Sequence, residues 1–358
     1  MAYTTIDDPS AYFQTALHSS SGSATITNDG NSDLQPDLIW SKSRNQTRNH
    51  ALYDSSRGVR KYVMSNLADV EATADSGFDL TSFNSDGFST GNNQFNVICG
   101  GDNYVAWQWK ANGGTTSSNT DGSITSTVQA NTTAGFSIVT YTGTGSATTI
   151  GHGLGAVPSV MIVKNRSKSS GEGWMVYHHK NTSAPETDYI QLHSTNGTVD
   201  NNIAWNDTAP TSTVFSVNND DSTNDSGETF VGYFFTEIQG YSKFGSYTGN
   251  AGEPNGPFVY LGFKPAWLMI KASSENGQAW FINDSKRDPT NEITKRLFPN
   301  LNSAEGEASG DNNLDYLSNG FKITTQDDGL NKSGVTYIYM AFAEHPFVSS
   351  EGVPTTAR

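Results

Sequence analysis

The sequence PSVMIVK at residues 158–164 recurs as PDLIWSK at residues 36–42 and as PAWLMIK at residues 265–271. Each copy has a proline, one variable position, a run of mostly large apolar residues and a lysine. Such a run is too short for a helix and favours a strand that is buried on both faces. Proline lacks an amide hydrogen, so it suits the first position of the strand. We expect the lysine to end the buried run with a charge that reaches water.

The segments on either side of this stretch repeat as well. Each proline follows a predicted strand and a Gly/Ser turn. A second apolar segment comes next, and each unit then closes on an aromatic segment, at residues 104–110, 230–237 and 337–344. The prolines lie 122 and 107 residues apart (158 − 36 and 265 − 158), whereas solenoid repeats run roughly 20–50 residues. The repeat therefore predicts whole domains.

The three closing segments align at alternate positions. Since side chains in a strand alternate between its two faces, each aligned trio is predicted to share one face. The trios are Val105/Trp107/Trp109, Val231/Tyr233/Phe235 and Ile338/Met340/Phe342.

These patterns predict an all-β protein of three tandem jelly-roll or lectin-like β-sandwich domains. The repeats are assigned to residues 11–111, 135–239 and 240–344. Three further segments lie outside them: an extended leader at residues 1–10, a Gly/Ser/Thr/Asn-rich linker at residues 112–134 and a tail at residues 345–358.

Composition excludes several functional classes. The net charge of −15 argues against binding nucleic acid through a basic surface. The single cysteine, Cys99, leaves no internal disulfide framework and is expected to be a small, partly buried residue. No apolar stretch is long enough for a transmembrane helix, and the first residues lack the pattern of a signal peptide. We therefore expect synthesis in a reducing cytoplasm and no insertion into a membrane.

One tryptophan, Trp205, has no counterpart in the other repeats. An exposed tryptophan beside Asn206 and Asp207 could bind a glycan, by stacking on a sugar ring while the amide and carboxylate form hydrogen bonds. The alternative, which we favour, is a tryptophan that covers an edge of the sandwich.

The acidic segment NNDDSTNDSGE at residues 218–228 could chelate calcium, but it lacks the spacing of an EF-hand. A solvated hairpin loop is the better interpretation, and the string DDG at residues 327–329 likewise predicts a hairpin turn. The pair His178 and His179 could bind a metal, yet adjacent strand residues point to opposite faces, so an ordinary strand end is preferred.

No serine or cysteine nucleophile motif is present, and no pair of carboxylates stands out among the 36 acidic residues. We therefore predict a protein that is not an enzyme and that holds no cofactor or metal.

Four strings resemble a family of virion structural proteins of tailed bacteriophages, especially marine ones, and the resemblance covers essentially the whole chain. They lie at residues 2–15, 117–145, 242–250 and 337–347. The resemblance implies a place in the virion, after synthesis in the cytoplasm of the host bacterium, and assigns no site residues. The expected role is in the tail fibre or adhesion apparatus that contacts the host surface. Two other readings stay open, a decoration or fibre protein of the capsid head and a depolymerase acting on surface glycan.

The same resemblance implies other virion proteins as partners, a homo-oligomer within the particle and a host-surface glycan as a further candidate. The leader and the tail carry apolar side chains that gain little in water, so they are expected to lie on another surface, either of their own domain or of a neighbour, and to help anchor the protein in the particle. The alternative is that both ends fray in water.

Overall fold

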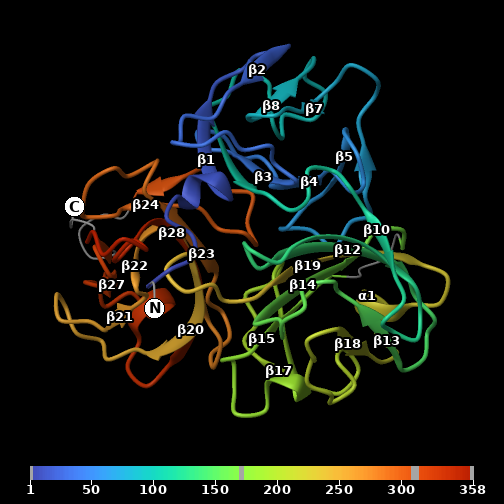
Figure 1. The fold of residues 1–358 in the computed structure, drawn as a ribbon. Helices are drawn as coiled ribbons and strands as arrows, with labels where there is room; N and C mark the ends of the chain where they lie inside the picture. Colours follow the sequence, from blue (N-terminus) through green and yellow to red (C-terminus); the bar gives the residue numbers. More distant parts are fainter. Residues whose placement is uncertain (1–2, 169–172, 308–313, 355–358) are drawn as a thin grey trace.

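A computed structural model describes residues 3–168, 173–307 and 314–354. Figure 1 shows three lobes around a common centre, one for each repeat. Almost all regular elements are antiparallel strands, so the predicted all-β class with packed sheets is confirmed.

The main sheet of each repeat contains four strands in the same spatial order. It runs from the first strand of the repeat to the closing strand, then to the proline-to-lysine strand and the strand that follows it. The three copies are β1 (Phe13–His18), β9 (Tyr104–Trp109), β3 (Leu38–Ser43) and β4 (Ala51–Asp54); β12 (Phe136–Thr142), β19 (Thr229–Phe235), β14 (Val160–Asn165) and β15 (Trp174–His178); and β20 (Ser242–Thr248), β28 (Thr336–Pro346), β22 (Phe263–Ala272) and β23 (Trp280–Asp284).

Additional strands extend these sheets at their edges. β5 (Lys61–Val63) and β6 (Ala72–Thr73) follow β4, while β16 (Asp188–Gln191) and β17 (Val199–Asp200) follow β15. On the other side of β12 lie β11 (Ser126–Asn131) and β10 (Ser117–Asn119). The segment predicted as a linker at residues 112–134 therefore supplies two sheet strands, and that prediction was wrong. Alternating small polar residues were taken for a flexible segment, although they pair well at a sheet edge.

Small second sheets lie against the main sheets. They comprise β2 (Ala24–Ile26), β7 (Leu80–Phe83) and β8 (Phe88–Thr90); β13 (Thr148–Gly151) and β18 (Val214–Val217); and β21 (Phe258–Tyr260), β26 (Leu314–Leu317) and β27 (Gly320–Ile323). The short pair β24 (Lys295–Arg296) and β25 (Gly306–Glu307) instead continues the edge of the third main sheet, because Leu297 and Ile282 of β23 exchange backbone hydrogen bonds of 2.7 and 3.0 Å. The helices are single turns, namely η1 (Pro9–Ala11), η2 (Pro185–Thr187), α1 (Asp221–Asn224) and α2 (Asp328–Asn331).

The strand registers show that the repeats are equivalent. The middle residue of each proline-to-lysine strand pairs with the middle of the closing trio: Trp40 with Trp107, Ile162 with Tyr233 and Met269 with Met340. Trp40, Ile162 and Met269 are only 3%, 4% and 1% exposed, which confirms the predicted burial. Pro36 and Pro158 precede their strands, whereas Pro265 lies inside β22, where the register shifts at a bulge.

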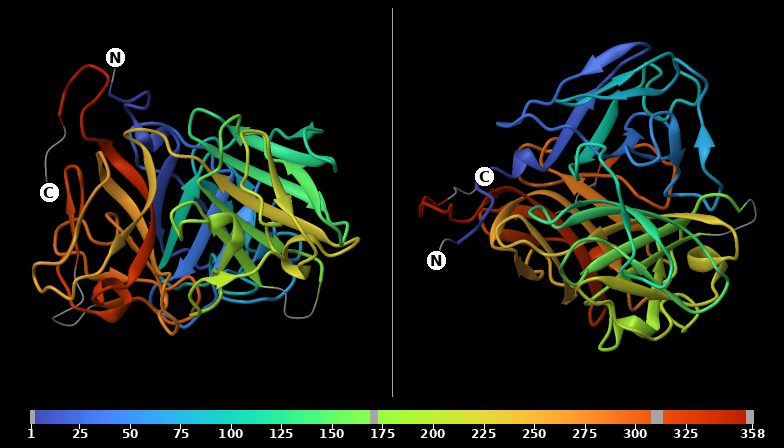
Figure 2. Two further views of the ribbon diagram at one scale, coloured as in Figure 1. Left: turned by 90° about the horizontal axis from the view of Figure 1, so that it is seen from below. Right: turned by 45° about the vertical axis from the view of Figure 1, so that its right-hand side comes forward.

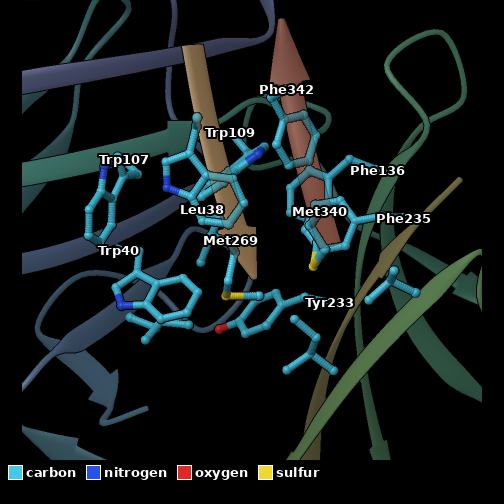
Figure 3. Close-up of a cluster of buried hydrophobic side chains, with 14 of the residues drawn as sticks. Leu38, Trp40, Trp107, Trp109, Phe136, Tyr233, Phe235, Met269, Met340 and Phe342 are labelled. Atoms are coloured by element: carbon cyan, nitrogen blue, oxygen red, sulfur yellow. The ribbon is translucent and has the colours of Figure 1, made fainter. Parts of the chain in front are cut away.

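One hydrophobic cluster at the centre of the molecule is shared by all three repeats. It contains the nine residues of the three closing trios, so the face predicted for each trio is turned to the other repeats (Figure 3). Trp109, for example, contacts Phe235 of the second repeat and Trp267 of the third, with ring centroids 6.4 and 5.5 Å apart. Three separate clusters fill the space between the sheets of the individual repeats.

Both chain ends pack beside the third repeat, as Figure 2 shows. Ile6 is 3% exposed and belongs to the central cluster. Thr4 donates a hydrogen bond of 2.8 Å to the carbonyl of Gln239, and the backbone amide of Ser350 donates one of 2.6 Å to Asp7. The leader thus lies on its own chain, while Val353 of the tail is 64% exposed. The last residues of the tail, 355–358, are outside the described residues.

Candidate functional site

The candidate glycan-binding residues lie in the turn before β18. Trp205 is 1% exposed, and its ring meets that of Tyr177 edge to face at 6.3 Å inside the second repeat. The ring therefore cannot stack on a sugar in this arrangement, and it covers the sandwich interior instead. Asn206 is half-buried and Asp207 is exposed, so the structure does not bring the three residues together as one binding surface.

The acidic segment at residues 218–228 is not the solvated hairpin loop that was predicted. It contains helix α1, and the side chain of Asp220 caps this helix by accepting a 2.7 Å hydrogen bond from the amide of Ser222. Asn224 is fully buried and donates a 2.7 Å hydrogen bond to the carbonyl of Ser146. Because its side chain replaces water as the partner of loop carbonyls, residues 222–224 of this polar segment can be buried, while its other residues stay partly or fully exposed. Lys168 forms ion pairs with Asp221 and Asp225.

The DDG string at residues 327–329 was also predicted wrongly, since it begins helix α2 with Asp327 as the cap. In the described part of the chain, no group of three or more His, Cys, Asp or Glu side chains is placed to hold a metal ion. No described helix has the length and apolarity to cross a membrane.

The lysines that end the three repeated strands do not reach water, contrary to the prediction. Lys42, Lys164 and Lys271 are each 0% exposed. Lys164 donates hydrogen bonds to the carbonyls of Asn165 and Ala68, at 2.7 and 3.1 Å. Burial lowers the pKa of Lys42 and of Lys271 to about 8. Backbone carbonyls thus take the place of water around the amine.

The boundary between the first and second repeats, called here seam 1–2, contains a buried polar network. Arg57 and Asp54 form an ion pair at 2.5 Å in which neither side chain is exposed. Tyr233 of the second repeat donates a 2.8 Å hydrogen bond to Asp54 and accepts one of 3.1 Å from Arg57. Glu71 binds Arg57 and Arg166, each at 2.9 Å, and so links the two repeats again. Burial alone would raise the pKa of Glu71, but its contacts with both guanidinium groups bring that pKa below its usual value.

The boundary between the third and first repeats, seam 3–1, has the equivalent network. Arg287 and Asp284 are unexposed and pair at 2.5 Å. Trp107 of the first repeat takes the place of Tyr233 and donates a 2.9 Å hydrogen bond to Asp284. Glu305 binds Arg287 at 2.9 Å and Arg44 of the first repeat at 2.8 Å.

The boundary between the second and third repeats, seam 2–3, uses histidines. His178 occupies the position of Asp54 and Asp284, and its Nε2 donates a 3.1 Å hydrogen bond to the carbonyl of Tyr339. His179 donates one of 2.7 Å to the carbonyl of Phe244. Burial lowers the pKa of His178 to about 3, so this ring is neutral. The pair binds backbone groups across the seam.

Sequence reasoning missed these networks, although it had one available signal. The string Asp-Ser-x-Arg occurs as DSSR at residues 54–57 and as DSKR at residues 284–287, directly after equivalent strands. A repeated Asp and Arg three residues apart at a strand end predicts a local ion pair. It does not identify the aromatic donor, which belongs to another repeat.

Two residues with potentially nucleophilic side chains, Ser20 and Cys99, lie in surroundings that do not activate them. Ser20 Oγ lies 3.1 Å from Nδ1 of His18. The other ring nitrogen of His18 is buried and has no hydrogen-bond partner among the described residues, and burial lowers the pKa of that ring to about 4. Cys99 is fully buried, and burial raises its pKa to about 12. Such a thiol is not readily ionised at neutral pH, so it lacks the reactivity of a nucleophile.

A surface hollow of about 450 Å³ lies in seam 3–1, and we call it the β1 groove. This volume falls within the roughly 300–1,000 Å³ that is usual for ligand pockets. Its lining combines strand β1 with β22 and β28 of the third repeat, namely Phe13, Gln14, Thr15, Lys264, Ala266, Ala343, Glu344 and His345, together with residues of the adjoining loops. Both lysines of the lining are paired with carboxylates: Lys264 binds Glu344 at 2.9 Å, and Lys286 binds Asp29. Asp8, which also lines the groove, accepts hydrogen bonds of 2.6 Å from the hydroxyls of Ser10 and Ser32. The groove is therefore polar, and its charged side chains already have partners within the fold.

Comparison with known proteins adds a family but no function. A search of curated proteins and a search of solved structures each returned no match. One family model, described as a domain of unknown function (DUF7483), matches residues 8–346, which include all three repeats. The chain therefore belongs to the DUF7483 family, whose single model spans the whole ring of repeats.

Proposed function

We propose that this protein is a non-enzymatic structural component of a bacteriophage virion, within the tail fibre or adhesion apparatus that contacts the host surface. The observation that carries the proposal is the way in which the repeats are joined. A shared apolar core and buried networks at the seams unite three β-sandwich units into one body. Such a body suits a rigid component that presents loops at its surface, where recognition sites usually lie.

The chemistry of the interior supports the same role. The buried arginines and carboxylates of seams 1–2 and 3–1 all have partners within the fold, so they serve cohesion between repeats. The likeness of residues 117–145 and 337–347 to virion structural proteins supports the assignment to a phage particle. Partners in this role are other virion proteins and further copies of the chain, with a glycan of the host surface as a candidate receptor.

Immunogold labelling of intact particles of the phage that encodes this chain tests the proposal. We expect gold at the tail. Labelling of the head would replace the tail assignment with capsid decoration, and absence of the protein from purified particles would contradict a virion role altogether. A second assay incubates the purified protein with host surface polysaccharide. We expect no loss of polymer length, whereas degradation would establish a depolymerase.

A further inference from the structure

Strand β1 of the first repeat is equivalent to β12 of the second, but the two strands differ in their neighbours. Each pairs on one side with the closing strand of its repeat. On its other side β12 pairs antiparallel with β11, whereas β1 is the last strand of its sheet among the described residues. The β1 groove lies beside the strand that lacks this neighbour.

Seam 1–2 shows what fills the corresponding space when a strand is present. Gln129 of β11 pairs with Ile138, the counterpart of Thr15, and is 0% exposed. Its amide donates hydrogen bonds of 3.0 and 2.8 Å to Ser55 and Ser56, and accepts one of 2.8 Å from the amide of Gly114. The strand thus inserts a neutral polar side chain between two repeats.

The walls of the two spaces correspond residue by residue. The amide of Ser55 donates a 2.9 Å hydrogen bond to the carbonyl of Asp37, and the amide of Ser285 donates one of 2.8 Å to the carbonyl of Ala266. Both Ser285 and Ala266 line the β1 groove. In seam 1–2 the space is filled by Gln129, and in seam 3–1 the same walls enclose the hollow.

The backbone of β1 is arranged to accept a strand. Since the amide of Lys110 donates to the carbonyl of Tyr12, the ladder alternation directs the backbone groups of Phe13, Thr15 and Leu17 away from β9. Within the described residues, Thr15 Oγ1 is buried with no hydrogen-bond partner. Leu17 is 37% exposed, so the far end of this edge is open to solvent.

We propose that the β1 groove binds an extended segment of a partner protein, which adds to β1 as an antiparallel strand and places a glutamine-like side chain beside Thr15. Both lysines of the groove are already paired with carboxylates, and Asp8 is held by two serine hydroxyls. The segment is therefore uncharged and polar, like strand β11, which fills the equivalent space in seam 1–2. Main-chain hydrogen bonds supply the affinity, and the inserted side chain supplies the specificity. The inference rests on the proposed function only in assigning the partner to the same particle.

The probe is a fluorescent peptide with the sequence of residues 125–134, TSTVQANTTA. We expect it to bind the purified full-length protein with a dissociation constant below about 1 mM. Binding should slow amide hydrogen exchange at Thr15 and Leu17. A peptide carrying Gln129→Leu should bind at least about tenfold more weakly, a loss of about 1.4 kcal/mol.

A pair of protein variants locates the site. Leu17→Pro removes an outward amide and leaves the ladder to β9 intact, whereas Leu17→Ala changes only the side chain. We expect the proline variant to lose peptide binding and the alanine variant to keep it, with equal thermal unfolding temperatures confirming that both fold. No binding at about 1 mM peptide, or equal binding by both variants, overturns the proposal.

Self-association that Leu17→Pro abolishes would identify a second copy as the occupant and overturn the assignment to a different partner. Because these measurements use purified protein, they can fail while labelling still places the protein in the virion, and the reverse also holds.

Discussion

The indole nitrogen of Trp107 donates a 2.9 Å hydrogen bond to Oδ2 of Asp284, although 177 residues separate them in the chain. The hydroxyl of Tyr233 makes the equivalent 2.8 Å contact with Asp54. In both cases the closing strand of one repeat contacts the last residue of an equivalent strand, β4 or β23, in a different repeat. Head-to-tail contacts of this type form a closed ring when successive units, each rotated relative to the one before, bring the last unit back to the first. In this protein the three repeats of one chain form such a ring.

Tyr233→Phe tests the value of one contact across a seam. Removal of the hydroxyl leaves Asp54 and Arg57 with one fewer partner in a fully buried site. We expect the free energy of unfolding to fall by about 1.5–3 kcal/mol, as for hydrogen bonds to charged groups. The measurement is the midpoint of denaturant unfolding.

Tyr53→Phe is the matched control for that substitution. Tyr53 is 0% exposed, and within the described structure its hydroxyl is buried without a partner. Deleting the same atom there should leave stability unchanged or raise it, because an unsatisfied group is removed. Equal losses from both substitutions would contradict a specific role for the Tyr233 hydroxyl.

Two neighbouring basic residues allow the contribution of a buried ion pair to stability to be compared with that of an exposed one. Arg287→Met should cost about 3–5 kcal/mol of stability, since it leaves the buried carboxylate of Asp284 without its charge partner. Lys286→Met removes an ion pair with Asp29, in which both side chains are largely exposed, and should cost about 0–1 kcal/mol. Urea unfolding of the two proteins measures the difference. A loss of similar size in both would show that the buried network does not hold seam 3–1.

Stability should decrease as the pH falls from 7 to 5. Burial lowers the pKa of His178 to about 3 and the pKa values of His18 and His193 to about 4. An unfolded chain binds these protons near pH 6.5, whereas the folded chain binds them only at lower pH, so protonation favours unfolding throughout this window.

The slope of unfolding free energy against pH provides the measurement. His178→Asn should flatten the slope increasingly as the pH falls from 7, by close to one bound proton at pH 5. A replacement of an exposed residue, such as Val353→Ala, should leave the slope as it is in the original protein. If acid had no effect on stability in this window, the histidines could not be buried in the neutral form.

The leader was assigned to a segment outside the repeats, but it should contribute to their folding because it packs in the central cluster. Ile6 is 3% exposed in the central cluster, so Ile6→Ala should cost about 2–5 kcal/mol. Val353→Ala in the exposed tail should change stability by less than about 0.5 kcal/mol. Thermal unfolding of both variants distinguishes the two ends. An unchanged melting temperature in the Ile6 variant would mean that the leader does not pack in the core.

Sequence alone determined the strands and their inward faces. PDLIWSK, PSVMIVK and PAWLMIK are short, apolar and bounded by proline and lysine, and such local properties specify buried strands. The alternation of side chains between the two faces of a strand likewise specified which residues of each closing segment share a face. These inferences hold because alternation and propensity act over a few residues and require no knowledge of the partner surface.

Only the tertiary structure decided which surface each of those faces covers. The pattern Val105/Trp107/Trp109 indicates burial equally well inside one sandwich or between repeats, and the fold turned it toward the other two repeats. The buried lysines were missed for a related reason, since the carbonyls that replace water around Lys164 come from loops, one of them 96 residues away. Trp205 was a candidate because its polar neighbours suggested exposure, whereas packing against Tyr177 placed its ring inside. Contacts between distant segments depend on how three sheets close around one core, and a linear pattern of residues does not record that closure.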